Sequence, residues 1–222
     1  MYNNNKLPNK ILLSGPKGIG KSTLAYHFIN YVFSINEEYK YDDKLYEINQ
    51  LNKSFKLIQN NTHQNFYLID LIDEKKIIEV SQVRKMIEYS NKSNFNNEPK
   101  IILIDNVENL NINSINALLK IIEEPNENTF FILIHDSNKK ILDTLKSRCL
   151  KFNVNMTFEK CIDVCNILSG HNILEMINSD LINFYNSPGY ILNFINFSIE
   201  NKIDLSNKNL KDFLFFLINE NL

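Results

Sequence analysis

The sequence predicts an α/β fold, in which a mostly parallel five-stranded sheet is followed by a small helical domain. Short apolar runs alternate with amphipathic segments over the first 155 residues, as expected for parallel strands covered by helices. A glycine-rich loop stands directly between the first apolar run and the first helical segment. Beyond residue 155 the apolar spacing becomes helical throughout. We therefore predict two domains, residues 1–155 and residues 156–222.

Five apolar runs predict the strands, because each is short and is bounded by turn residues or charges. They are Lys10 to Ser14, Asn65 to Asp70, Lys100 to Asp105, Thr129 to Ile134 and the weaker Leu150 to Val154. Helical spacing predicts a helix over residues 21–33, with an apolar face of Leu24, Phe28, Ile29 and Val32. The same spacing predicts helices from Val80 to Ile87, with Ser81 as the candidate N-cap, and over residues 115–122. Residues 37–65 are polar without clear periodicity, which indicates an insertion or an irregular helical piece.

Length, net charge and cysteine content limit which nucleic-acid and membrane partners the chain can have. The chain has 222 residues and a formal net charge of −2, so it does not coat nucleic acid by overall charge, and any DNA contact must be local or shared. Three cysteines, an odd and low number, favour a reducing cytoplasm over a disulfide framework. No apolar run reaches the roughly 18 residues of a membrane span. We expect a soluble cytoplasmic protein with no membrane partner.

The glycine-rich loop carries the strongest chemical signal. Residues 15–22, GPKGIGKS, match G-x-x-x-x-G-K-[ST], in which glycines let the backbone curl so that several N–H groups face one anion. The lysine then reaches the β- and γ-phosphates, and the serine hydroxyl binds Mg²⁺. The residues expected to bind the phosphates are Gly15, Pro16, Lys17, Gly18, Ile19, Gly20, Lys21, Ser22 and Thr23.

The third strand ends in a carboxylate, Asp105. In P-loop proteins an aspartate at this place holds Mg²⁺, usually through water, so Ser22 and Asp105 are the predicted metal ligands and ATP with Mg²⁺ the predicted cofactors. The alternative is an aspartate that only ends the strand and caps the next helix.

Several segments resemble the AAA+ clamp-loader family, and within it the delta-prime subunits of DNA polymerase III. Asn116 to Pro125 is similar to that family's N-A-L-L-K-x-L-E-E-P signature, and Thr144 to Cys149 is similar to its S-R-C motif. Leu7-Pro8 and the stretch from Val80 to Arg84 also fit. The resemblance covers residues 7 to about 155.

The resemblance implies a RecA-like α/β domain, a three-helix lid, and a place in the ring that opens the sliding clamp and loads it on primed DNA. The partners would be the gamma/tau and delta subunits and, through them, the clamp and the DNA. Arg148 would be an arginine finger that reaches ATP on a neighbouring subunit. The alternative is a surface arginine in a basic patch with Lys146 and Lys151.

One departure from the family pattern bears on ATP hydrolysis. Asn106 stands where hydrolysing relatives place a glutamate, and an amide cannot take a proton from water. Glu108 is not expected to point the same way. Whether this chain is an enzyme is therefore uncertain: it would belong to the DNA polymerase III holoenzyme, with weak or absent ATP hydrolysis of its own.

Other family features are altered or missing. Residues 23–99 contain no cysteine, so no zinc is expected, and Tyr190 replaces a sensor arginine of the lid. Residues 134–137 match a polar sensor, but the sequence does not indicate which side chain serves. The adenine-holding N-terminal segment is expected to be mostly missing, and the collar domain absent. Cys161 and Cys165 indicate a buried thiol pair rather than a metal site.

Two other functions remain open. One is a structural adaptor with a relic P-loop. The other is a free-standing P-loop phosphotransferase, which would need a mobile, arginine-rich lid. The region after residue 155 contains no arginine, and this disfavours the phosphotransferase.

Overall fold

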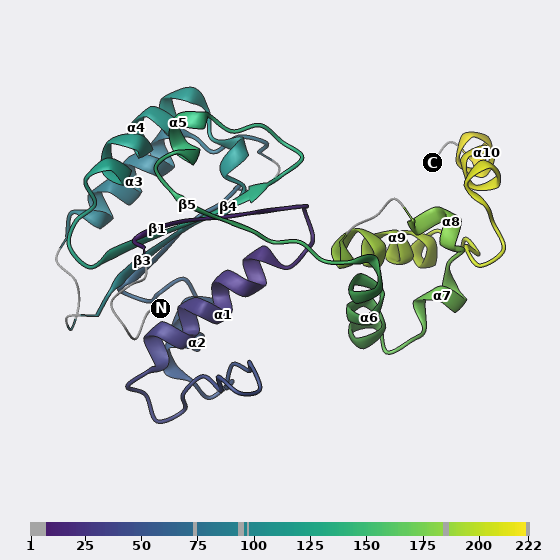
Figure 1. Ribbon diagram of the computed structural model, residues 1–222, viewed down its shortest axis with the longest axis horizontal. Helices are drawn as coiled ribbons and strands as arrows, with labels where there is room; N and C mark the ends of the chain where they lie inside the picture. The colour runs from purple at the N-terminus through teal and green to yellow at the C-terminus, as the bar shows by residue number, and fades with distance from the viewer. Residues whose placement is uncertain (1–7, 73–74, 93–95, 97, 184–186, 221–222) are drawn as a thin grey trace. The chain divides into compact units, whose positions relative to one another are not determined.

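The computed structural model describes residues 8–72, 75–92, 96, 98–183 and 187–220 (Figure 1). Leu7, one of the residues that carried the resemblance, lies outside the described residues. Contacts between residues divide the chain into two compact units. The first unit comprises residues 1–15 and 21–153, and the second comprises residues 16–20 and 154–222.

A five-stranded sheet forms the centre of the first unit, and all of its ladders are parallel. The order is β2-β3-β4-β1-β5, with the bounds β1 Lys10–Gly15, β2 Phe66–Ile69, β3 Lys100–Ile104, β4 Thr129–Asp136 and β5 Leu150–Asn153. This confirms the predicted fold class. Because the strands are parallel, their carboxyl ends share one edge of the sheet, and the register places Asp136 beside Gly15.

Helices cover both faces of this sheet. Figure 1 shows α1 (Lys21–Ser34) and α2 (Lys53–Gln59) on one side, and α3 (Val80–Ser90), α4 (Ile112–Glu123) and the short α5 (Asp143–Lys146) on the other. A 3₁₀ turn, η3 (Val107–Asn109), follows β3. The core between the sheet and α3 and α4 is built from alternate strand residues and the inner helix faces; it includes Leu12, Ile102, Ile104, Leu133, Val83, Met86, Leu118 and Ile122.

Two local expectations were wrong. The N-cap of α3 is Glu79 rather than Ser81, in a reciprocal capping box in which Glu79 N donates to Gln82 Oε1 at 2.9 Å. This box satisfies two helix-end donors at once, which a serine inside the helix cannot do. Leu24, expected on the apolar face of the first helix, is 50% exposed; that face is formed instead by Ala25, Ile29, Val32 and Phe33.

Lys100, the first residue of β3, is a buried cation at the amino edge of the sheet. It is 1% exposed, and its Nζ donates to the carbonyl oxygens of Tyr89, Ser90 and Lys92 at 3.1, 3.2 and 2.5 Å. These carbonyls lie at or just beyond the end of α3, where a cation also suits the helix dipole. Lys100 therefore serves as the C-terminal cap of α3.

The second unit is helical, apart from an isolated bridge between Ile177 and Leu205. Its helices are α6 (Phe158–Ser169), α7 (Ile173–Met176), α8 (Ser179–Ile182), α9 (Pro188–Glu200) and α10 (Leu210–Glu220). Their core includes Cys161, Cys165, Ile191 and Phe213. Burial raises the pKa of the Cys165 thiol to about 11, so both cysteines act as small apolar side chains. Within the described ranges, no helix combines the length and apolar character needed to cross a bilayer.

Candidate functional site

The middle of the glycine-rich loop has the backbone that its motif requires. Gly18 and Gly20 have φ of +78° and +93°, values that strain any residue with a Cβ. Within the second unit, Gly189 N donates to Gly18 O at 3.0 Å, and a Cβ on Gly189 would lie 2.7 Å from the Gly18 Cα. This approach requires glycine at both positions.

The other predicted loop residues differ in exposure. Ile19 is buried, Pro16 is half-buried, and Lys17 is exposed. Thr23 lies in the first turn of α1 and is also exposed.

Lys21 begins α1 and turns its ammonium back toward the end of β1. The residue is 6% exposed, and Nζ donates to Gly15 O at 2.7 Å. The same oxygen accepts Ser137 N at 3.0 Å, so the ammonium lies beside the carboxyl end of β4. Burial lowers the pKa of Lys21, and the carboxylates of Asp136, Asp105 and Glu108 oppose that shift.

The two predicted metal ligands meet. Ser22 Oγ donates to Asp105 Oδ2 at 2.6 Å, and Asp105 Oδ1 accepts Asn106 N at 2.7 Å. Burial raises the pKa of Asp105, aided by the charges of Asp70 and Glu108, while its two hydrogen bonds oppose the rise. A hydroxyl and a carboxylate at this separation are a donor set that suits Mg²⁺.

Asn106 faces β2, where sequence reasoning placed no site residue. Its backbone is left-handed, with φ 54°, and its Nδ2 donates to Asp70 Oδ1 at 2.7 Å. Asp70 follows β2 directly, just as Asp105 follows β3. Both close an apolar run with an aspartate, and this shared pattern was the signal that could have identified Asp70.

Glu108 faces the opposite neighbour, β4. Its Oε2 accepts Asp136 N at 3.1 Å, its Oε1 lies 3.6 Å from Lys139 Nζ, and its side chain is 2% exposed. As expected, Glu108 and Asn106 do not point the same way. Sequence reasoning nevertheless missed Glu108, whose carboxylate acts on both Lys21 and Asp105.

Residues 134–137 form the segment in which the sequence did not indicate which side chain serves as the polar sensor. His135 Nε2 contacts Lys139 O at 2.9 Å and its Nδ1 contacts Ser14 Oγ at 3.0 Å. Since a carbonyl only accepts, Nε2 carries the proton in the neutral ring, and Nδ1 accepts from the serine. Asp136 is 8% exposed and is the residue of this segment whose charge acts on Lys21.

Arg148 is held by its own chain. Nε donates to Glu123 Oε1 at 2.7 Å, and Nη1 donates to Thr144 O at 2.8 Å. Its side chain remains 35% exposed. Glu123 belongs to the E-E-P signature and Arg148 to S-R-C, so the ion pair joins the two segments that carried the resemblance.

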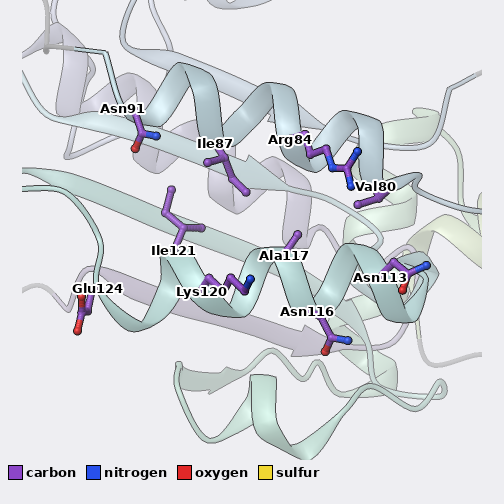
Figure 2. A pocket seen from close by; sticks show the side chains of 10 residues that line it. All are labelled: Val80, Arg84, Ile87, Asn91, Asn113, Asn116, Ala117, Lys120, Ile121 and Glu124. Atoms are coloured by element: carbon purple, nitrogen blue, oxygen red, sulfur yellow. The ribbon is translucent and has the colours of Figure 1, made fainter.

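A groove of about 660 Å³ runs between α3 and α4 (Figure 2). Figure 2 shows Arg84 on α3 and Lys120 on α4, two cations on its opposite walls. The lining residues are Val80, Arg84, Ile87, Asn91, Asn113, Asn116, Ala117, Lys120, Ile121 and Glu124. The groove is thus lined by two segments that carried the resemblance, the stretch from Val80 to Arg84 and that from Asn116 to Pro125.

Comparison with protein families and curated relatives gives consistent matches. A family model described as "DNA polymerase III, delta subunit" matches residues 1–157. "DNA polymerase III subunit delta'" of Pseudomonas aeruginosa is 31% identical over 140 residues, which are 63% of this chain and 41% of the relative. The protein of the same name from Buchnera aphidicola subsp. Baizongia pistaciae is 30% identical over 155 residues, 68% of this chain and 45% of the relative.

A gamma subunit also matches. "DNA polymerase III subunit gamma" of Buchnera aphidicola subsp. Schizaphis graminum is 30% identical over 168 residues, 73% of this chain and 42% of the relative. The chain therefore spans less than half the length of these three relatives.

Solved structures resemble it more distantly. A DNA polymerase III gamma subunit-related protein of Thermotoga maritima has 16% identity and a TM-score of 0.49, with 88% of this chain and 55% of that chain covered. The RuvB Holliday junction branch migration motor of the same organism has 15% identity and a TM-score of 0.48, with 92% and 60% covered.

Proposed function

The chain belongs to the DNA polymerase III delta-subunit family, and from this premise we propose that it acts as a delta-prime-like clamp-loader subunit in DNA replication. In this role it binds ATP and supplies Arg148 to a neighbouring subunit. The proposed partners are the gamma/tau and delta subunits, and through them the sliding clamp and primed DNA. Such an assembly works on DNA in the cytoplasm, where we place this chain. The division into domains at residue 155 stays a prediction.

One observation carries the nucleotide proposal, the 2.6 Å hydrogen bond between Ser22 Oγ and Asp105 Oδ2. The fold brings these two residues together although they lie 83 positions apart in sequence. In the proposed complex Ser22 and Asp105 would hold Mg²⁺, which neutralises phosphate charge. Lys21 would place its ammonium on the phosphates, and the loop amides would bind the remaining oxygens.

Weak hydrolysis follows from Asn106. Its amide donates to Asp70 and has no basic atom that could take a proton from an attacking water. Glu108, the nearest glutamate in sequence, already accepts Asp136 N and lies beside Lys139. Both carboxylate oxygens of Glu108 are therefore engaged within the chain, on the side of β4 and away from Asn106. We propose that nucleotide serves this subunit as a bound ligand more than as a substrate.

Arg148 can serve a neighbour because its guanidinium is partly exposed and is presented by a fixed ion pair. A positioned guanidinium stabilises the charge that develops on a transferring phosphoryl group. Glu123 and the Thr144 carbonyl would fix the direction of the side chain.

Isothermal titration with ATP and Mg²⁺ tests the nucleotide proposal. We expect saturable binding that Lys21→Met weakens by about 100-fold, the effect of losing a charge-assisted phosphate contact. Lys85→Met, which removes an exposed cation of α3, is the matched control and should bind like the parent chain. A parent chain without saturable heat would instead indicate an adaptor with a relic P-loop.

The ATPase rate of the assembled clamp loader tests the arginine finger. Arg148→Ala should leave this chain's own nucleotide affinity unchanged and lower the assembly's rate by about 10³-fold, the usual contribution of such a residue. Lys146→Ala, which removes a nearby cation paired with Asp143, should leave the rate unchanged. Equal loss in both variants would favour the basic-patch interpretation.

A further inference from the structure

The carboxyl end of β4 is the part of the site for which the sequence assigned no side chain. Gly15 O accepts both Lys21 Nζ, at 2.7 Å, and Ser137 N, at 3.0 Å. Asp136 precedes Ser137 and pairs in register with Gly15. Two donors on one carbonyl oxygen must lie close to each other, so the Lys21 ammonium has the Asp136 segment as its immediate neighbour on the β4 side.

Asp136 is fixed in this position. It is 8% exposed, its N–H donates to Glu108 Oε2 at 3.1 Å, and its own Oδ1 accepts Asn138 N at 3.1 Å. The side chain of Glu108 is 2% exposed. Glu108 thus holds the backbone of Asp136 where β3 and β4 end, and the Asp136 carboxylate braces its own turn through Asn138 N. Lys139, 3.6 Å from Glu108, offsets one of the two charges.

A terminal phosphate that reaches the phosphate-loop lysine needs hydrogen-bond donors around its remaining oxygens. A carboxylate offers only acceptors, and in a poorly solvated position it repels a phosphate strongly. The nearby His135 cannot replace it as a donor, because its Nε2 bonds to Lys139 O and its Nδ1 is the acceptor of Ser14.

We propose, resting on the nucleotide site of the preceding section, that this site selects a nucleoside diphosphate over a triphosphate, with Asp136 as the specificity-determining residue and Glu108 as the residue that positions it. The diphosphate keeps the loop amides, Lys21 and the Ser22–Asp105 pair. The triphosphate adds a negative charge beside Asp136. Selection therefore arises at the third phosphate, whereas the base and sugar contribute equally to both ligands.

The test is isothermal titration of the full chain with ADP and with ATP, each with Mg²⁺ in excess. We expect ADP to bind about tenfold more tightly or better, as expected for one added like charge beside a partly desolvated carboxylate. Asp136→Asn should narrow the gap, mainly by strengthening ATP binding. Asp143→Asn removes a carboxylate that is 96% exposed and should leave the ratio unchanged.

The outcomes separate this inference from the function on which it rests. If neither nucleotide binds, the proposed nucleotide site is wrong and the selectivity falls with it. If both bind equally tightly, or if Asp136→Asn leaves the ratio unchanged, nucleotide binding stands and only the selectivity is overturned. Should Asp136→Asn not fold, by its circular dichroism, the parent ratio and two variants of Glu108 decide. Glu108→Ala removes the acceptor of Asp136 N and should lower the preference for ADP, whereas Glu108→Gln, which still accepts Asp136 N, should keep it.

Discussion

At the carboxyl edge of the sheet, Lys21, Asp136 and the side chain of Glu108 lie almost entirely out of solvent. The core of the second unit buries aliphatic side chains, two thiols and a phenyl ring instead. Removing charge from water costs free energy even when the charges are paired, whereas apolar burial supplies the favourable part of folding. The buried charges of the first region therefore lower the free energy of unfolding, and a charged ligand that binds there can offset this loss. The core of the second unit only raises the free energy of unfolding.

The largest expected effect lies in the second unit. Ile191 is fully buried in its core, and Ile191→Ala should lower the free energy of unfolding by about 3 kcal/mol through lost burial and the cavity left behind. Urea denaturation measures this loss. Ile199→Ala, on the same helix but 61% exposed, should change it by less than about 0.5 kcal/mol. Similar losses in the two variants would contradict the described packing.

Lys100 is a buried charge that has no proposed ligand, so its effect on stability can be compared with that of the charges in the nucleotide site. Lys100 donates to three carbonyl oxygens, and Lys100→Met removes these charge-assisted hydrogen bonds, which should lower the free energy of unfolding by about 2 kcal/mol. Tyr89 O and Ser90 O keep Lys92 N and Asn126 Nδ2 as donors. The exposed Lys85→Met is the control. A Lys100→Met variant as stable as its control would mean that burial of the cation cancels what its hydrogen bonds contribute.

Substitution of Asp105 should raise the free energy of unfolding, whereas substitution of Lys100 should lower it. Burial raises the pKa of Asp105, so its charged form is disfavoured in the folded chain, and Asp105→Asn should raise the free energy of unfolding by about 1 kcal/mol. The same change should weaken binding of the nucleotide with Mg²⁺. Thermal denaturation and titration calorimetry measure the two effects. A variant that loses both stability and binding would show Asp105 to be a structural residue.

The smallest expected effect is a pH dependence. A carboxyl whose folded pKa is raised stabilises the chain below its unfolded pKa, about 3.9, and loses this contribution as the pH rises through the folded value. The advantage of Asp105→Asn over the parent chain should therefore shrink as the pH falls from about 7 to about 4. Denaturation midpoints of both chains across this range provide the measurement, and a constant difference would argue against the raised pKa.

The features predicted from sequence are those encoded by a single segment. The apolar runs predicted the strands, and the loop motif together with the run ending at Asp105 selected a hydroxyl and a carboxylate that the structure places 2.6 Å apart. The resemblance to delta-prime subunits is confirmed by the family match together with the delta' relatives.

The features that were missed depend on which strands are neighbours. Parallel strands bring Asp70, Asp105 and Asp136 to one edge, but Asp70 and Asp136 flank Asp105 there because β3 lies between β2 and β4. No local pattern specifies that order. Glu108 depends further on the 3₁₀ turn after β3, which directs it toward β4 while Asn106 faces β2.

The carbonyl oxygen of Gly15 bears on how Lys21 exchanges this oxygen for an anion. An oxygen with two lone pairs accepts both Lys21 Nζ and Ser137 N–H. When the ammonium turns away toward an anion, the Ser137 N–H remains, so the Gly15 carbonyl keeps a donor. The contact between the ends of β1 and β4 through Ser137 N and Gly15 O therefore does not depend on where the lysine points.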